Sequence, residues 1–167
     1  MDWKLLAPIA ALAACAVQHP QNAEEFRQYV PGATFGKVQS FEANRAFRDV
    51  AKTFQAKAPE CLNIAVRTVE TSSTSNINVL TTYKPTVVVS EKRAELHVQR
   101  SLKGNVIVPG KPPKGGDYFV VADATPLERN RTRIDIYSPS MGATALVRAI
   151  TGWATGENVG CPDMTKR

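Results

Sequence analysis

The spacing of apolar residues changes twice along this chain, and this change most constrains its fold. Residues 44–58 have the spacing of an amphipathic helix, the later segments alternate apolar with polar residues, and the segment ending near residue 155 is again helical. Six strands are predicted, at residues 37–43, 62–70, 77–90, 93–102, 117–125 and 131–137. The order β-α-β-β-β-β-β-α predicts an α+β fold, with an antiparallel sheet of about five to six strands packed on two helices.

Both predicted helices have one apolar face. Asn44 is the expected cap of the first helix and Pro59 its expected end, while residues 138–140 offer a cap for the second. The two faces consist of Phe47, Val50, Ala51, Phe54 and Ala58, and of Ala143, Leu146, Val147, Ile150, Trp153 and Ala154. We expect both helices to cover one face of the sheet with these residues.

This order of elements resembles the helix-grip arrangement, in which a curved sheet wraps around the terminal helix. Over residues 37–155 it is similar in outline to the helix-grip modules of a lipoprotein of the outer-membrane β-barrel assembly machinery. The length of the chain without its first 15 residues predicts a single domain, over residues 36–167. Such folds can leave a cavity between sheet and helix, which Phe47, Phe54, Phe119 and Trp153 would line here; a plain filled core is the alternative.

The N-terminus has the pattern of an export signal. A short start with one lysine precedes an apolar run over residues 5–14, which is about half of the ~20 residues that a membrane-spanning helix needs. Leu12-Ala13-Ala14-Cys15 resembles the lipobox of bacterial lipoproteins, which implies cleavage before Cys15 and acylation of its thiol. Ordinary secretion, with cleavage after Ala13 or Ala16, is the alternative.

The lipobox also bears on location. It implies a lipid anchor in the bacterial cell envelope, and an alanine rather than an aspartate at position 16 favours the periplasmic side of the outer membrane. Residues 16–35 are polar, contain Pro20 and Pro31, and predict a flexible tether between anchor and domain. Phe26, Tyr29 and Val30 could instead pack on the domain.

Two cysteines remain once Cys15 is acylated. An even pair in an oxidising compartment predicts a disulfide between Cys61 and Cys161, with two unrelated buried thiols as the alternative. Neither cysteine has another cysteine or a histidine at zinc-ligand spacing, so no metal site is predicted.

The chain is basic, with 21 Lys and Arg against 15 Asp and Glu and a net charge of +6. This balance favours anionic partners such as lipid headgroups, lipopolysaccharide, acidic cell-wall polymers or an acidic protein surface. Because the export signal places the domain outside the cytoplasm, nucleic acid is not an expected partner.

No catalytic motif is recognisable. His19 lies in the tether and His97 on the polar side of a strand; neither a nucleophile elbow nor a zinc-protease motif occurs. Asp117, Asp123 and Asp135 are scattered over two strands, where we expect them to face solvent or to pair with bases. The sequence predicts no catalytic residue and no cofactor.

Two basic features are candidates for anion binding. Arg129, Arg131 and Arg133 alternate along a predicted strand and would share one face, where they could clamp phosphates or carboxylates. Lys111 and Lys114 lie in a loop rich in Gly and Pro that lacks a phosphate-binding motif. A solvated strand face that discourages edge pairing, and an ordinary exposed loop, are the alternatives.

Three functions remain open. The leading hypothesis is a non-catalytic, lipid-anchored scaffold or assembly module that binds another envelope protein. The second is a carrier of a lipid or an anionic ligand, and the third is an envelope-polymer hydrolase. A scaffold predicts a filled core with an exposed apolar patch or a free sheet edge, a carrier predicts a cavity of ~300–1,000 Å³, and a hydrolase predicts acids that converge in a cleft.

Overall fold

The computed structural model describes residues 19–71, 76–128 and 130–165. The predicted signal peptide over residues 1–15, with Cys15, lies outside the described residues, as does Arg129. The elements are α1 (Ala23–Tyr29), a 3-10 turn η1 (Val30–Gly32), β1 (Gly36–Ala43), α2 (Phe47–Leu62), β2 (Ala65–Thr71), β3 (Asn76–Val89), β4 (Ala94–Gly104), β5 (Asp117–Glu128), β6 (Arg131–Pro139) and α3 (Thr144–Thr155).

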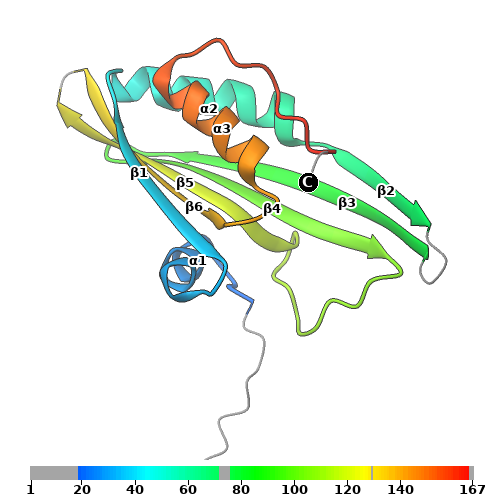
Figure 1. Cartoon of the computed structure of the whole chain (residues 1–167). Coiled ribbons are helices and arrows are strands. Elements are labelled where there is room, and N and C mark those ends of the chain that lie inside the picture. The colour runs from blue at the N-terminus through cyan, green and yellow to red at the C-terminus, as the bar shows by residue number, and fades with distance from the viewer. Residues whose placement is uncertain (1–18, 72–75, 129, 166–167) are drawn as a thin grey trace, which may run out of the picture.

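The strands form one six-stranded antiparallel sheet in the order β1-β6-β5-β4-β3-β2. Strands β2 to β6 follow one another as hairpins, whereas β1 crosses to the far edge and pairs with β6. Helices α2 and α3 cover one face, and α1 lies against the opposite face (Figure 1). The predicted α+β class and the antiparallel sheet are therefore confirmed.

The core lies between the sheet and the two long helices. Alternate residues of the central strands point toward α2 and α3 because side chains of a strand alternate between its two faces. Phe54, Trp153 and Phe119, which were expected to line a helix-grip cavity, are buried in the core cluster, and Phe47 packs against it. The fully buried residues include Leu96, Val98, Val120, Ile134, Ile136, Leu146 and Ile150.

The ends of both helices differ from the predicted ones. Helix α2 begins after Ala46 rather than at Asn44, and it continues through Pro59 to Leu62. A proline inside a helix costs ~3 kcal/mol because it removes one backbone hydrogen bond and crowds the preceding turn. Burial of Cys61 and Leu62 in the core offsets that cost.

Helix α3 begins at Thr144, several residues after the predicted cap at residues 138–140. The reason lies in the preceding strand, which extends to Pro139, and in the Ser140 amide, which donates a hydrogen bond to the Phe35 carbonyl. The chain therefore cannot turn into the helix until it has left the sheet.

The predicted tether is largely ordered structure. Residues 23–32 form α1 and η1, and Ala23, Phe26 and Val30 are buried against Val121 of β5. The alternative that residues of this segment pack on the domain holds for Phe26 and Val30, whereas Tyr29 is 46% exposed. The flexible-tether prediction is wrong for residues 23–32, because three apolar side chains on one side of a short helix suffice to dock it.

The predicted disulfide is present. Cys61 and Cys161 are bonded, with their Cα atoms 5.0 Å apart and 100 positions apart in sequence. The bond ties the end of α2 to the C-terminal segment, which carries no regular structure after α3. Among the described residues, no helix combines the length and the apolar character needed to cross a membrane.

Candidate functional site

Two of the three arginines predicted to bind anions, Arg131 and Arg133, are paired with acids. Arg131 donates hydrogen bonds to Glu42 at 2.9 Å and to Glu128 at 2.8 Å, and Arg133 forms an ion pair with Asp135 at 3.1 Å. Hydrogen bonds to Glu128 and to Asp135 are the largest causes of the raised pKa of Arg131 and of Arg133, respectively. Both side chains point away from the core, as predicted, but their charges are balanced by neighbours.

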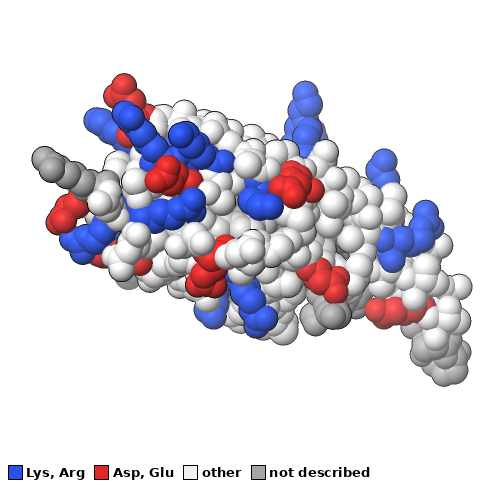
Figure 2. Space-filling view, turned by 90° about the horizontal axis from the view of Figure 1, so that it is seen from above, with Lys and Arg blue, Asp and Glu red and all other residues white. Residues whose placement is uncertain are grey.

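Lys111 and Lys114 are exposed in the loop between β4 and β5. Figure 1 shows this loop and the β5–β6 hairpin, which carries Arg131, at different ends of the sheet. Figure 2, which looks onto the α2 and α3 side, shows basic side chains interspersed with acidic ones rather than one continuous basic surface. The net positive charge is therefore distributed, and these two regions do not combine into one anion site.

A buried ionic cluster holds α1 on the sheet. The Arg27 side chain is 9% exposed and donates two hydrogen bonds of 2.7 Å to Asp123, itself 8% exposed. It also contacts Glu95, which pairs with His97 at 3.0 Å and with Arg93 at 2.8 Å. Asp123 thus pairs with a base, which was one of the two environments expected for it. Its partner, Arg27, comes from the segment predicted to be a tether.

The electrostatics of this cluster favour its charged form. Burial lowers the pKa of Arg27, but hydrogen bonds to Asp123 and Glu95 outweigh it and raise the pKa. Burial likewise raises the pKa of Glu95, and the hydrogen bonds and charge of its basic neighbours bring it below its usual value. A general acid in a hydrolase needs the opposite shift, so the surroundings of Glu95 favour its ionised form.

The segment before α1 is attached at His19. Its Nδ1 lies 2.6 Å from Asp117, and its Nε2 contacts the Pro109 carbonyl in the β4–β5 loop. Hydrogen bonding to the Pro109 carbonyl and to Asp117 raises the pKa of His19. Because both partners are acceptors, the doubly protonated ring satisfies both contacts at once.

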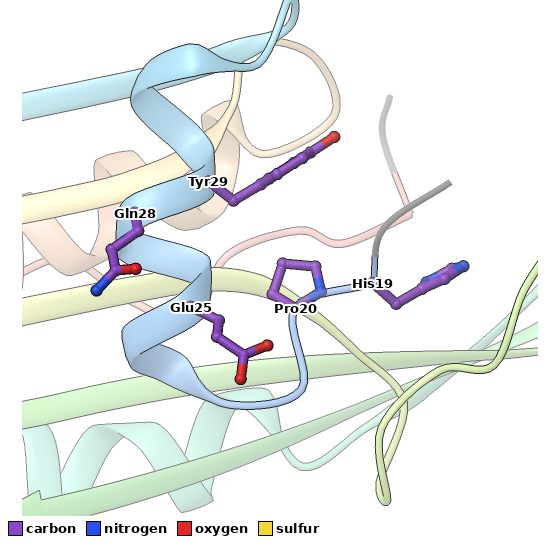
Figure 3. A pocket seen from close by; sticks show the side chains of 5 residues that line it. All are labelled: His19, Pro20, Glu25, Gln28 and Tyr29. Atoms are coloured by element: carbon purple, nitrogen blue, oxygen red, sulfur yellow. The ribbon is translucent and has the colours of Figure 1, made fainter. Parts of the chain in front are cut away.

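A depression of about 490 Å³ lies beside this segment. Figure 3 shows Glu25, Gln28 and Tyr29 projecting from α1 and His19 from the preceding segment, with Gln28 turned away from the others. Glu25 accepts hydrogen bonds from the Gln21 amide and from Asn22, so the polar groups here cap the helix and fasten its start.

A larger groove of about 770 Å³ lies on the side of the sheet that carries α2 and α3. Strands β2 and β3 extend past the ends of both helices, which leaves this part of the sheet without a helix over it (Figure 1). The start of α3 and the C-terminal segment form the other walls. Its apolar lining consists of Val66, Ile77, Val79, Tyr83, Leu102, Val106, Met141 and Met164.

Of the described residues that line this groove, Arg100 is the one basic residue, and we call the site the Arg100 groove. Its guanidinium stacks over the Phe119 ring at 4.4 Å, and it makes no ion pair with any residue in the described part of the chain. Apolar residues at the rim remain accessible, since Met141 is 67% and Val106 37% exposed. Apolar walls with a single charge are the usual character of a ligand site.

The groove lies beside one edge of the sheet. Within the described residues, strand β2 is the last strand of the sheet and is paired with β3, from Ala65↔Thr82 to Thr71↔Asn76. Its Val66 and Thr68 residues line the groove. An edge strand offers backbone donors and acceptors to an additional strand.

Arg100 was not among the predicted site residues, although the sequence contains a signal for it. In β4 the residues Leu96, Val98 and Leu102 form the apolar series, and Arg100 occupies the position in that series where another apolar residue is expected. A charge on the apolar face of a strand indicates either a buried pair or a site open to solvent. In the structure Arg100 lines a groove, which corresponds to the open site.

One group of candidate metal donors occurs in the described residues. A Glu60 oxygen and the sulfurs of Cys61 and Cys161 lie within 4.8 Å of one another. Both sulfurs are consumed by the disulfide, and metal ligation by cysteine requires the thiolate. The cluster is therefore a disulfide with an adjacent acid.

Comparison with family models finds no match, and comparison with curated proteins finds none either. Among solved structures, a conserved protein from Geobacillus kaustophilus is 15% identical, with a TM-score of 0.31, over 71% of this chain and 84% of that chain. A hypothetical protein from Helicobacter pylori is 12% identical, with a TM-score of 0.35, over 78% of this chain and 90% of that one. Similarity at this level supports no functional argument.

Proposed function

We propose that this chain is a non-catalytic interaction module of the bacterial cell envelope, and that the Arg100 groove binds a short apolar segment of another envelope protein. The observation that carries the proposal is the groove itself, an apolar surface of the sheet left open beside the edge strand β2. A concave surface with apolar walls and one charged group is typical of a binding site.

The chemistry of the groove defines the partner segment. Its apolar side chains would cover Val66, Leu102 and Met141, and a carboxylate beside them would pair with Arg100. An extended segment can also add a strand to β2, so that main-chain hydrogen bonds supply affinity and alternate side chains enter the groove. We therefore expect a partner sequence that alternates apolar residues around one Asp or Glu.

The proposed anchor would keep this module at a membrane surface. Acylation of Cys15 is inferred from the lipobox alone, and the Cys61–Cys161 disulfide supports an oxidising compartment such as the periplasm. We infer a location on the periplasmic side of the outer membrane, where the domain meets other envelope proteins.

The test is in-cell photo-crosslinking from position 102 on the groove floor, combined with the Arg100→Glu variant. A crosslinked envelope protein that disappears in Arg100→Glu is expected, because a glutamate would repel the partner's carboxylate. Lys103→Glu is the matched control, since this neighbour is exposed and does not line the groove. Equal crosslinking in both variants would refute the role of the groove.

The position of Arg100 favours a second candidate, a lipid with an anionic headgroup. An acyl chain would replace the partner's apolar side chains, and the headgroup would replace its carboxylate. Mass spectrometry of the full chain purified in gentle detergent separates the two candidates. A bound lipid that is lost in Arg100→Glu, without a protein partner, would establish the carrier.

A further inference from the structure

A second, polar cleft lies beside α3. It shares Ser140 and Thr144 with the Arg100 groove, but its charged residues are different ones. It measures about 260 Å³ and lies between the edge strand β1, the end of β6 and one face of α3. Its polar and charged lining consists of Lys37, Gln39, Ser138, Ser140, Thr144, Arg148, Thr151 and Glu157.

The arrangement follows from the register of the sheet and the period of the helix. Lys37 is paired with Ser138 across β1 and β6, so both side chains lie on the face toward α3. Thr144, Arg148 and Thr151 are spaced at i, i+4 and i+7, which places them along one side of the helix facing β1. Because α3 is set back from the sheet edge, a cleft remains between these two polar rows.

The two cations of the cleft have no acidic partner among the described residues. Lys37 and Arg148 enter none of the ion pairs there, whereas Arg27, Arg131 and Arg133 are all neutralised by neighbours. The one acid in the lining, Glu157, accepts a hydrogen bond from the Thr155 hydroxyl. The cleft therefore keeps an excess of positive charge.

The Ser138 hydroxyl adds a donor to the cleft. Ser138 borders the cleft, and its hydroxyl makes no hydrogen bond within the part of the chain that the structure describes. Its oxygen is not fully buried, since the one buried side-chain atom without a partner among the described residues is Trp153 Nε1, so the hydroxyl can donate to an acceptor that enters the cleft. Phosphate oxygens accept from hydroxyls, ammonium and guanidinium alike.

From these observations we infer that the cleft between β1 and α3 is a binding site for a phosphate group. Lys37 and Arg148 would neutralise its charge, while Ser138 and the α3 threonines would donate hydrogen bonds to its oxygens. The volume suits inorganic phosphate or a small phosphate ester, and it is smaller than the ~300–1,000 Å³ of drug-sized ligand sites. Free phosphate and a lipid-type headgroup share this chemistry.

The inference is tested by two-dimensional amide NMR of the full chain in mild detergent. Inorganic phosphate and glycerol 3-phosphate are titrated in separate arms, with glycerol as the neutral control. Saturable shifts confined to residues around positions 37, 138 and 148 are expected with at least one phosphate compound, and the tighter arm identifies the source. Absence of such shifts in both arms would overturn the inference.

Matched variants distinguish a specific phosphate site from the general attraction of phosphate to a basic protein. Lys37→Gln combined with Arg148→Gln should weaken phosphate binding by about tenfold or more, because it removes both charge-assisted contacts. Lys84→Gln combined with Lys103→Gln removes the same charge from exposed positions outside the cleft and should leave affinity within about twofold. Equal weakening in the two pairs would refute a specific site, and Thr151→Val offers a further variant with no change in charge.

Discussion

At the scale of single residues, His19 shows how one side chain can join distant parts of the chain. It contacts Asp117 at the start of β5 and the Pro109 carbonyl in the preceding loop. Each contact needs a hydrogen on one ring nitrogen, Nδ1 for Asp117 and Nε2 for the Pro109 carbonyl. The two contacts together favour the doubly protonated ring, and they raise the pKa of His19. The attachment of residues 19–22 to the loop is therefore linked to pH.

The sign of this linkage follows from the raised pKa. A group whose pKa is higher in the folded state binds its proton more tightly when the chain is folded. The stability that His19 contributes is therefore complete below its unfolded-state pKa of 6.5, and it is lost as the pH rises through its folded-state pKa. We expect the protection of amides in residues 105–116 from hydrogen exchange, taken relative to the intrinsic rate at each pH, to fall between neutral and alkaline pH. In His19→Asn exchange should be faster already at pH 6, and the difference from the unaltered chain should vanish at pH 9.

The imidazole signals of His19 provide a direct check. NMR titration should give a pKa above 6.5 for this ring. A value at or below 6.5, or loop exchange that is the same in both proteins at pH 6, would contradict the linkage.

At the scale of elements, α1 is the least self-sufficient part of the fold. It spans 7 residues, too few to be stable alone in water, and it lies on the face opposite the other helices. Its attachment combines the apolar contacts of Phe26 and Val30 with the buried Arg27 cluster. Such a short helix forms only when it is docked on the sheet. Protection of its amides from hydrogen exchange therefore measures the strength of those contacts.

Arg27→Met tests the ionic part of this attachment. The change removes the cation and leaves Asp123 and Glu95 buried without it, a situation that typically costs ~3–5 kcal/mol. We expect the free energy of unfolding in urea to fall by an amount of that order at pH 7, and α1 amides to lose their protection from exchange.

Arg93→Met is the matched control. Arg93 binds the same Glu95 but is 42% exposed, so its loss should cost less than ~1 kcal/mol. A similar, small effect of both variants would show that the Arg27 cluster does not hold α1.

At the scale of the whole molecule, the disulfide closes a loop that contains almost the entire sheet. Cys61 and Cys161 are 100 positions apart, with β2 to β6 and α3 between them. The C-terminal segment that it fixes also supplies Met164 to the Arg100 groove. Stability and the shape of the groove therefore depend on the same covalent link.

Reduction measures this contribution. For a loop of about 100 residues the chain-entropy model gives ~4–5 kcal/mol, so we expect reductant to lower the unfolding midpoint strongly. The double variant Cys61→Ser, Cys161→Ser should have the lower unfolding midpoint without reductant, and reductant should not change that midpoint. An unchanged midpoint on reduction would mean that the bond does not stabilise the fold.

Much of the architecture could be predicted because it depends on local periodicity. The apolar stripe of Val50, Phe54 and Ala58 and the alternation through Ile134 and Ile136 appear in the structure as the buried faces of α2 and β6. Helix ends were predicted poorly, since burial of Leu62 outweighs the helix-breaking effect of Pro59.

The chain's own sequence thus determined the α+β class, the faces of its long helices and strands, and the pairing of Cys61 with Cys161. The first two depend on patterns of a few residues, and the pairing was predicted by setting Cys15 aside as the lipidation site. Only the tertiary structure decided the docking of α1 through Arg27, the acids opposite Arg131 and Arg133, and the two clefts beside α3. The reason is physical: which charges meet, and which surface stays uncovered, depends on contacts between residues far apart in sequence.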